Sequence, residues 1–162
     1  MMNHRSRSSS HGARLRAVPW LFAGVMLLAA TPAFAEPLAA GRVKVASGSV
    51  FIVRAGNVGP AHVGQPVYEA DVVRTGADGR IGITLNDDTR VSLGPASEVS
   101  LDRFAYAPSE GQLGFVLKVV RGVAAYVSGR IAKLSPDSVR LETPGAIVGV
   151  RGTTLALRVV PE

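Results

Sequence analysis

The chain of 162 residues contains no cysteine, which excludes both disulfides and thiolate metal sites. Histidine is scarce too, and His62 is the only one after residue 35. A Ser-His-Asp or Cys-His centre would have to use it, because general bases near neutral pH are usually histidines. The glycines and proline around His62 predict an ordinary loop, and no serine has the Gly-x-Ser-x-Gly flanks of a nucleophile elbow. We therefore expect no catalytic residue and no enzymatic activity.

The acidic residues lack the spacing of a known metal site. Asp78, Asp87 and Asp88 could offer oxygen ligands to calcium from loops, but no EF-hand spacing is present. Turn chemistry explains all three, because Asp bonds to nearby backbone groups in turns. No pair of carboxylates stands out as the acid and base of a glycosidase. We expect no metal and no cofactor.

Basic residues do not cluster along the sequence. The net charge is +6, but four of the 18 basic residues precede residue 17. Residues 36–162 have 14 basic and 12 acidic residues, a net charge of +2, and their arginines are scattered singly from Arg42 to Arg158. A surface for nucleic acid or an anionic membrane needs a basic patch. We therefore expect no nucleic-acid partner.

The N-terminus has the pattern of a secretory signal peptide. A basic region precedes an apolar run at residues 20–30, and Ala33 and Ala35 supply the small residues of an A-x-A cleavage site. The run falls short of the ~20 residues that a membrane-spanning helix needs, which disfavours an uncleaved anchor. We expect a signal-peptide helix in residues 1–35, cleavage after Ala35, and a mature domain at residues 36–162. That domain would be periplasmic or secreted, without stable insertion in a membrane.

The mature part shows the pattern of short strands. Residues 71–99 alternate apolar and polar side chains and break at Gly, Asp and Pro, as half-buried antiparallel strands do. Within residues 80–85, alternation places Ile81, Ile83 and Leu85 on one face. Residues 86–88, Asn-Asp-Asp, suit a hairpin turn because Asn and Asp tolerate left-handed backbone.

Other segments add further predicted strands and loops. Val43 and Val45 alternate with the basic residues at 42 and 44, residues 55–60 predict a loop, and Gly122 separates strands at 115–120 and 123–127. In total about ten strands follow one another at roughly 8–12-residue spacing, which is typical of a sandwich or barrel. We predict an all-β fold, a compact two-layer sandwich or roll. The alternative is a short β-helix, for which no strict repeat is present.

Several motifs follow one another along nearly all of residues 36–162. The most specific are Asp71-Val-Val-Arg-Thr-Gly76, Thr143-Pro-Gly-Ala146 and Val150-Arg-Gly-Thr153. Taken together, these motifs resemble the FecR domain. One departure is Asp88, where the family usually carries Gly in a turn, and Asp can still make that turn. In the best-known members the domain is the periplasmic half of a membrane-spanning regulator that senses an outer-membrane receptor during iron uptake and controls a sigma factor. This chain has neither a cytoplasmic helical segment before the apolar run nor a module after residue 162, so we expect a stand-alone exported domain.

These observations together predict a binding module for an envelope or outer-membrane protein, with a role in envelope sensing or signalling. Exposed strand edges are a natural site, because unpaired backbone groups give affinity without special side chains. The alternative is a structural envelope protein that contacts glycan or self-associates through strand edges.

Three side chains are candidates for the binding surface. Arg151 could donate two parallel hydrogen bonds to a carboxylate, although the glycines on either side also favour a structural bend. Phe104 and Tyr106 share one face of a strand and could form an aromatic patch, with core filling as the alternative.

Overall fold

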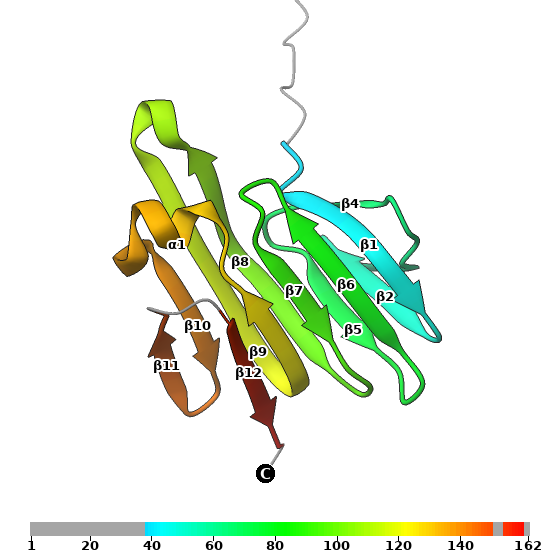
Figure 1. Ribbon diagram of the computed structural model, residues 1–162. Coiled ribbons are helices and arrows are strands. Elements are labelled where there is room, and N and C mark those ends of the chain that lie inside the picture. Colours follow the sequence, from blue (N-terminus) through cyan, green and yellow to red (C-terminus); the bar gives the residue numbers. More distant parts are fainter. Residues whose placement is uncertain (1–37, 151–153, 161–162) are drawn as a thin grey trace, which may run out of the picture. The chain divides into compact units, whose positions relative to one another are not determined.

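Twelve strands, one short α-helix and two 3-10 helices make up the computed structural model, which describes residues 38–150 and 154–160. The predicted signal peptide, with Ala33 and Ala35, lies outside the described residues. The strands are β1 (Gly41–Ser47), β2 (Val50–Arg54), β3 (Asn57–Pro60), β4 (Pro66–Val67), β5 (Val72–Thr75), β6 (Arg80–Leu85), β7 (Arg90–Leu93), β8 (Glu98–Ala107), β9 (Gln112–Val127), β10 (Val139–Thr143), β11 (Ala146–Gly149) and β12 (Thr154–Val159) (Figure 1). The helices are η1 (Pro108–Glu110), α1 (Arg130–Leu134) and η2 (Pro136–Ser138). None of them is long and apolar enough to cross a lipid bilayer. The all-β prediction is confirmed.

The strands form one curled sheet with two layers. Along the sheet the order is β3-β2-β5-β8-β9-β7-β6-β1-β4, with β10, β11 and β12 off this path. The front layer contains β1, β4, β6, β7, β12 and the C-terminal part of β9 (Figure 1). The back layer contains β2, β3, β5, β8, β10, β11 and the N-terminal part of β9. Every pairing except β9–β10 is antiparallel, which excludes a parallel β-helix.

The loop between β3 and β4 joins the two ends of the strand order. The Gly64 N–H donates to the Val43 carbonyl at 2.8 Å, and the Val43 N–H donates to the Gln65 carbonyl at 3.0 Å. These bonds attach the loop that follows β3 to β1, which belongs to the other layer. The sheet therefore closes into a roll, and most of its apolar face is covered by the opposite layer.

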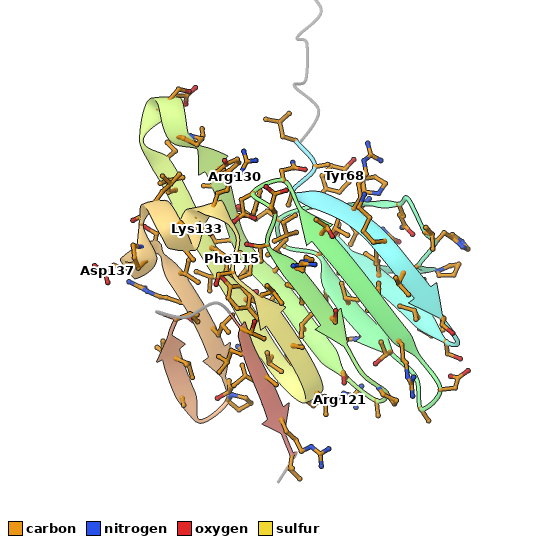
Figure 2. All side chains as sticks on the ribbon, viewed as in Figure 1. Tyr68, Phe115, Arg121, Arg130, Lys133 and Asp137 are labelled. Atoms are coloured by element: carbon orange, nitrogen blue, oxygen red, sulfur yellow. The ribbon has the colours of Figure 1, made fainter. Side chains whose placement is uncertain are left out.

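The core lies between the two layers and follows the predicted alternation. Ile81, Ile83 and Leu85 are 3%, 5% and 4% exposed, whereas the residues between them are half-buried on the other face. The largest side chain at the centre is Phe115, which is fully buried and packs its ring 5.5 Å from that of Tyr126 (Figure 2). Both rings come from β9, one from each layer. This strand therefore anchors the core.

Strand β9 is continuous through Gly122, where the sequence predicted two separate strands. Its first part pairs with β8 as far as Arg121, and from Gly122 onward it pairs with β12. Gly122 has φ +84°, a left-handed conformation that glycine adopts without steric cost, so the strand bends there from the back to the front layer.

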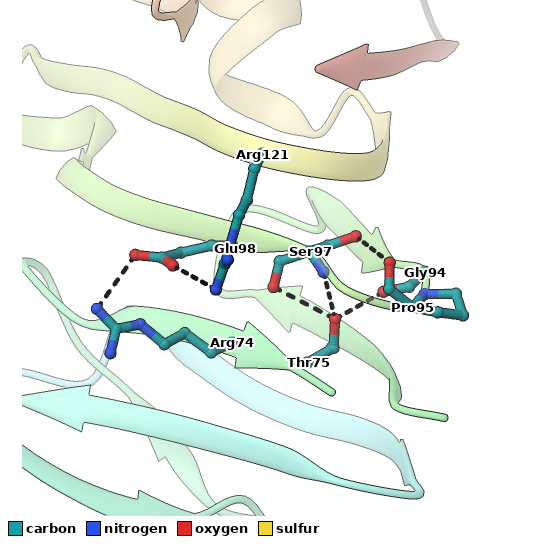
Figure 3. A network of polar contacts seen from close by, with 7 residues as sticks. All are labelled: Arg74, Thr75, Gly94, Pro95, Ser97, Glu98 and Arg121. Carbon is teal, nitrogen blue, oxygen red and sulfur yellow. Dashed lines mark hydrogen bonds and ion pairs between the residues drawn. The ribbon is translucent and has the colours of Figure 1, made fainter. Parts of the chain in front are cut away.

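The segment from β7 to β8 bends beside Gly122 and is fixed by side-chain hydrogen bonds. The Thr75 hydroxyl donates to the Gly94 carbonyl at 2.7 Å and accepts the Ser97 N–H at 2.8 Å (Figure 3). The Ser97 hydroxyl oxygen in turn accepts the Val123 N–H at 2.8 Å. These small polar side chains satisfy backbone groups where the ladder is interrupted, as buried polar groups require.

Two local predictions are wrong. A β-bulge lies between Val43 and Val45, so the alternation shifts by one residue and Val45 is 56% exposed. Residues 57–60, predicted as part of a loop, form strand β3 because their backbone pairs with β2. Both predictions failed because the pairing of backbone groups between strands cannot be deduced from the alternation of apolar and polar side chains.

Candidate binding groove and strand edges

Strands β10 and β12 occupy the same side of β9. The opposite side of β9 is taken by β8 along its first part and by β7 along its last part. On the remaining side, β10 pairs with the first part of β9 in the parallel direction, and β12 pairs with the last part in the antiparallel direction. The β10–β11 hairpin and β12 leave a groove between them.

This groove has a volume of about 520 Å³ and is mainly apolar. Its walls are the turn that joins β10 to β11 and the C-terminal end of β12, and Val120 of β9 also contributes to its lining. The lining residues are Val120, Thr143, Pro144, Gly145, Ala146, Val148, Leu157, Arg158, Val159 and Val160. Arg158 is the one ionisable side chain among them, so the groove suits apolar side chains more than a charged ligand.

Two sheet edges beside the groove are open. In the part of the chain that the structure describes, β11 pairs only with β10, and β12 pairs only with β9. Large apolar side chains stand exposed here, Ile147 on β11 at 70% and Val160 just beyond β12 at 74%. Unpaired strand edges beside exposed apolar residues can bind another strand, because backbone hydrogen bonds extend the sheet.

The aromatic candidates lie elsewhere, on β8. Phe104 and Tyr106 are half-buried and pack against the edge of the core. The pKa of Arg130 is raised, mainly by a side-chain hydrogen bond with Tyr106. The Arg130 guanidinium also forms an ion pair with Asp88 at 3.0 Å. The third candidate, Arg151, lies outside the described residues.

The groups weighed for chemistry take part in turns and loops. His62 is exposed, and its backbone N–H donates to the Gln65 side chain. Asp88 adopts φ +67° in the β6–β7 turn, as the sequence predicted for this position. Asp78 accepts hydrogen bonds from the side chain and backbone of Ser49, which lower the pKa of that carboxyl. Within residues 38–150 and 154–160, no three His, Asp or Glu side chains are grouped to hold a metal ion.

Asp87 differs from its neighbours because it is fully buried. Its carboxylate accepts the Thr89 hydroxyl at 2.7 Å, the Thr89 N–H at 3.0 Å and the Ile131 N–H at 3.3 Å. This carboxylate therefore links the β6–β7 turn to α1. Its role in the described contacts is architectural.

Asp71 begins the motif Asp71–Gly76 and is also fully buried. Both of its oxygens accept hydrogen bonds from the Arg54 guanidinium at 2.8 Å, and one also accepts the Tyr68 N–H. The guanidinium carbon lies 4.3 Å from the centre of the Tyr68 ring, a cation–π contact. These contacts hold the loop between β4 and β5 to β2. The motif residues therefore maintain the fold, and the groove lies in a different part of the sheet.

The groove was not predicted from the sequence. One wall is the motif Thr143–Ala146, but only the pairing of β10 and of β12 with β9 brings this turn beside the end of β12. Ile147 and Val160 are large apolar residues that the structure leaves exposed. The sequence could not show this, because it did not reveal which strands would lack a neighbour.

Comparison with known proteins identifies a family for this chain. The family model described as FecR protein matches residues 71–161, which is more than half of the chain and includes β5 to β12. No curated protein and no solved structure matches the chain.

Proposed function

Because this chain belongs to the FecR family, which is associated with envelope signalling, we propose that it is an exported, non-enzymatic binding module that recognises an envelope protein. The observation that carries this proposal is the pair of open edges, β11 and β12, beside an apolar groove. In this mechanism a strand of the partner adds to an open edge, and its apolar side chains enter the groove. Backbone hydrogen bonds give affinity, and the side chains in the groove give specificity.

Residues that line the groove and a residue on the neighbouring edge strand β11 divide these tasks between them. Leu157 and Val159 are half-buried and pack against the core, so they shape the groove without being free to move. Ile147 and Val160 are exposed and can lose most of their remaining accessible surface when a partner binds. We therefore expect these two side chains to carry much of the binding energy, since burial of apolar surface drives association.

Site-specific photo-crosslinking in intact cells tests the proposal. A photoreactive residue at position 160 should capture one defined envelope protein, identified by mass spectrometry. The photoreactive residue placed at position 58 provides the control. Val58 is 62% exposed on β3, the edge strand at the start of the sheet order. The same set of captured proteins at both positions would contradict a specific site at β12.

Purified proteins then give the quantitative test. Ile147→Asp and Val160→Asp should each weaken binding of the captured protein about tenfold or more, equivalent to ~1.4 kcal/mol. Val58→Asp should leave the affinity unchanged. An affinity of Val160→Asp equal to that of the parent protein would refute the groove as the site, and an unchanged affinity of Ile147→Asp would refute a role for the edge of β11.

Self-association is a second candidate, because the two open edges could also pair with edges of another copy. It predicts that the molar mass measured by light scattering rises with concentration and falls in Val160→Asp. A monomeric mass at all concentrations, together with a captured partner, would favour the first proposal.

A further inference from the structure

The outward face of the front layer carries five cationic side chains that are far apart in the sequence. They are Arg42, Lys44, Arg80, Arg90 and Arg158, and all are exposed. In the described residues, the strands of this layer contain no Asp or Glu. The arginines that the sequence scatters singly are thus gathered by strand pairing into a patch of one sign.

A strip of small side chains crosses the middle of this face. Strand pairing places one residue from each of five neighbouring strands side by side, namely Val45, Gly82, Ser92, Ala125 and Ala156. We call these five residues the front strip. With neighbouring strands about 4.8 Å apart, the strip is about 19 Å long.

Cations flank the front strip on both sides. Arg42 and Arg90 lie on one side, each paired with Thr84 of β6. Arg80 and Arg158 lie on the other side, paired with Ser47 and Val123. Two residues along a strand span about 7 Å, so the two rows of cations are about 14 Å apart at the backbone.

These five cations are not neutralised within the described part of the chain. Its ion pairs join Arg54 to Asp71, Arg74 and Arg121 to Glu98, and Arg130 to Asp88. The back layer thus places a carboxylate between two of its arginines (Figure 3), which the front face does not do. In the turns at the ends of the front strands, Asp88 is paired with Arg130, and Asp78 is hydrogen-bonded to Ser49.

Gly82 lies in the front strip without an internal reason to be glycine. A Cβ atom there would come no closer than 3.5 Å to any atom, which is ordinary contact, and φ is not left-handed. Glycine in a strand often marks close approach of a ligand or of another backbone. A floor in which Ser92 and Ala156 are exposed and Gly82 and Ala125 are half-buried, with arginines on both sides, fits that description.

We propose that the front strip binds an acidic protein segment, in which a ridge of apolar side chains is flanked by Asp or Glu. The ridge packs on the small residues, and the carboxylates reach the arginines, whose planar guanidinium suits bidentate pairing. A glycan fits less well, because the five strip residues include no aromatic ring and a single hydroxyl, that of Ser92. Arg158 is the one residue shared with the groove, and this inference stands whether or not the groove binds a partner.

Binding of designed peptides to the purified protein tests the inference. The probe is a synthetic amphipathic helix with one leucine ridge flanked by glutamates, and fluorescence anisotropy measures its affinity. The matched peptides have the same composition in scrambled order, or lysine in place of glutamate. We expect the designed peptide to bind, and to bind at least tenfold more weakly after Arg80→Glu, Arg90→Glu or Gly82→Val.

Control variants separate this site from the rest of the molecule. Arg103→Glu, which reverses an exposed cation of the back layer, and Ile147→Asp on β11 should leave peptide affinity unchanged. Thermal melting of each variant must match the parent protein. The inference is overturned if no peptide binds, if the scrambled peptide binds equally, if Arg80→Glu has no effect, or if alginate or duplex DNA binds more tightly than the peptide.

Discussion

Gly122 lies directly against Ser97 at the bend between the two layers. A Cβ atom on Gly122 would be 2.3 Å from the Ser97 hydroxyl oxygen and 2.5 Å from the Ser97 Cα. The Ser97 hydroxyl cannot move aside freely, because it accepts the Val123 N–H and is within hydrogen-bond distance of the Pro95 and Val123 carbonyls. The close approach of these two residues therefore requires glycine at position 122.

We predict that Gly122→Ala lowers the free energy of unfolding by about 2–4 kcal/mol, from overpacking and a left-handed backbone. Urea denaturation measures this difference. Gly59→Ala is the matched control, since a Cβ there meets nothing within 4 Å and φ is not left-handed. Similar stability losses in both variants would show that the bend does not depend on this contact.

Replacing Ile83 by Asp should prevent folding. Ile83 is 5% exposed in the core, and an unpaired carboxylate there costs several kcal/mol, comparable to the whole stability of a domain. Circular dichroism should show loss of the β spectrum, while Thr84→Asp on the outward face should keep it. An Ile83→Asp protein that melts within a few degrees of the parent would contradict this assignment of the core.

The buried Asp87 carboxylate should be essential for the link between the β6–β7 turn and α1. Asp87→Ala leaves the Thr89 hydroxyl, the Thr89 N–H and the Ile131 N–H without this acceptor. We expect a loss of about 3 kcal/mol, since each unsatisfied buried donor costs roughly 1–3 kcal/mol and the site can partly relax. Asp87→Asn keeps one acceptor oxygen and should cost less. Chemical denaturation of both variants checks the order.

Stability should fall as the pH rises from about 10 to 12, because of Tyr126. In the folded protein the pKa of Tyr126 is raised from 10.0 to about 12, mainly by burial and secondly by the nearby negative charge of Asp87. A hydrogen bond with Thr89 has a smaller, opposite effect on this pKa. Between these values the unfolded chain has released the phenolic proton and the folded protein still holds it. The stabilisation is therefore complete below pH 10 and declines by about 2–3 kcal/mol as the pH reaches 12.

Tyr126→Phe isolates this contribution from other groups that titrate at high pH. The variant should lack the part of the pH dependence due to residue 126, and the parent should show one tyrosine whose absorbance at 295 nm changes only near pH 12. Identical stability profiles for the two proteins between pH 10 and 12 would contradict the prediction.

We also propose cleavage after Ala35 on export, which predicts a mature protein that begins at Glu36. Intact-mass measurement of the exported protein tests this directly. Ala35→Asp should block processing because the peptidase requires a small residue there, whereas Ala39→Asp, beyond the site, should not. A mass that includes Met1 in the exported parent protein would refute it.

The alternation of apolar and polar residues was sufficient to predict the strands that place one face on the core and the other toward solvent. Ile81 and Ile83 lie inward as expected, and Asp88 forms the turn that its tolerance of left-handed backbone predicted. The bulge at Val45 and the bend of β9 at Gly122 escaped prediction, because the first depends on pairing with β6 and the second on pairing with β12, both distant in the sequence. Long-range pairing is also what forms the groove and gathers the front cations.

The position of β9 also has consequences for folding kinetics. It pairs with β7 and β8, which precede it, and with β10 and β12, which follow it. A sheet dominated by such distant pairings closes slowly, on the order of milliseconds to seconds, because loop entropy is lost before contacts are gained. Until β12 arrives, the last part of β9 has an unpaired edge, and unpaired strand edges in partly folded chains are prone to aggregate.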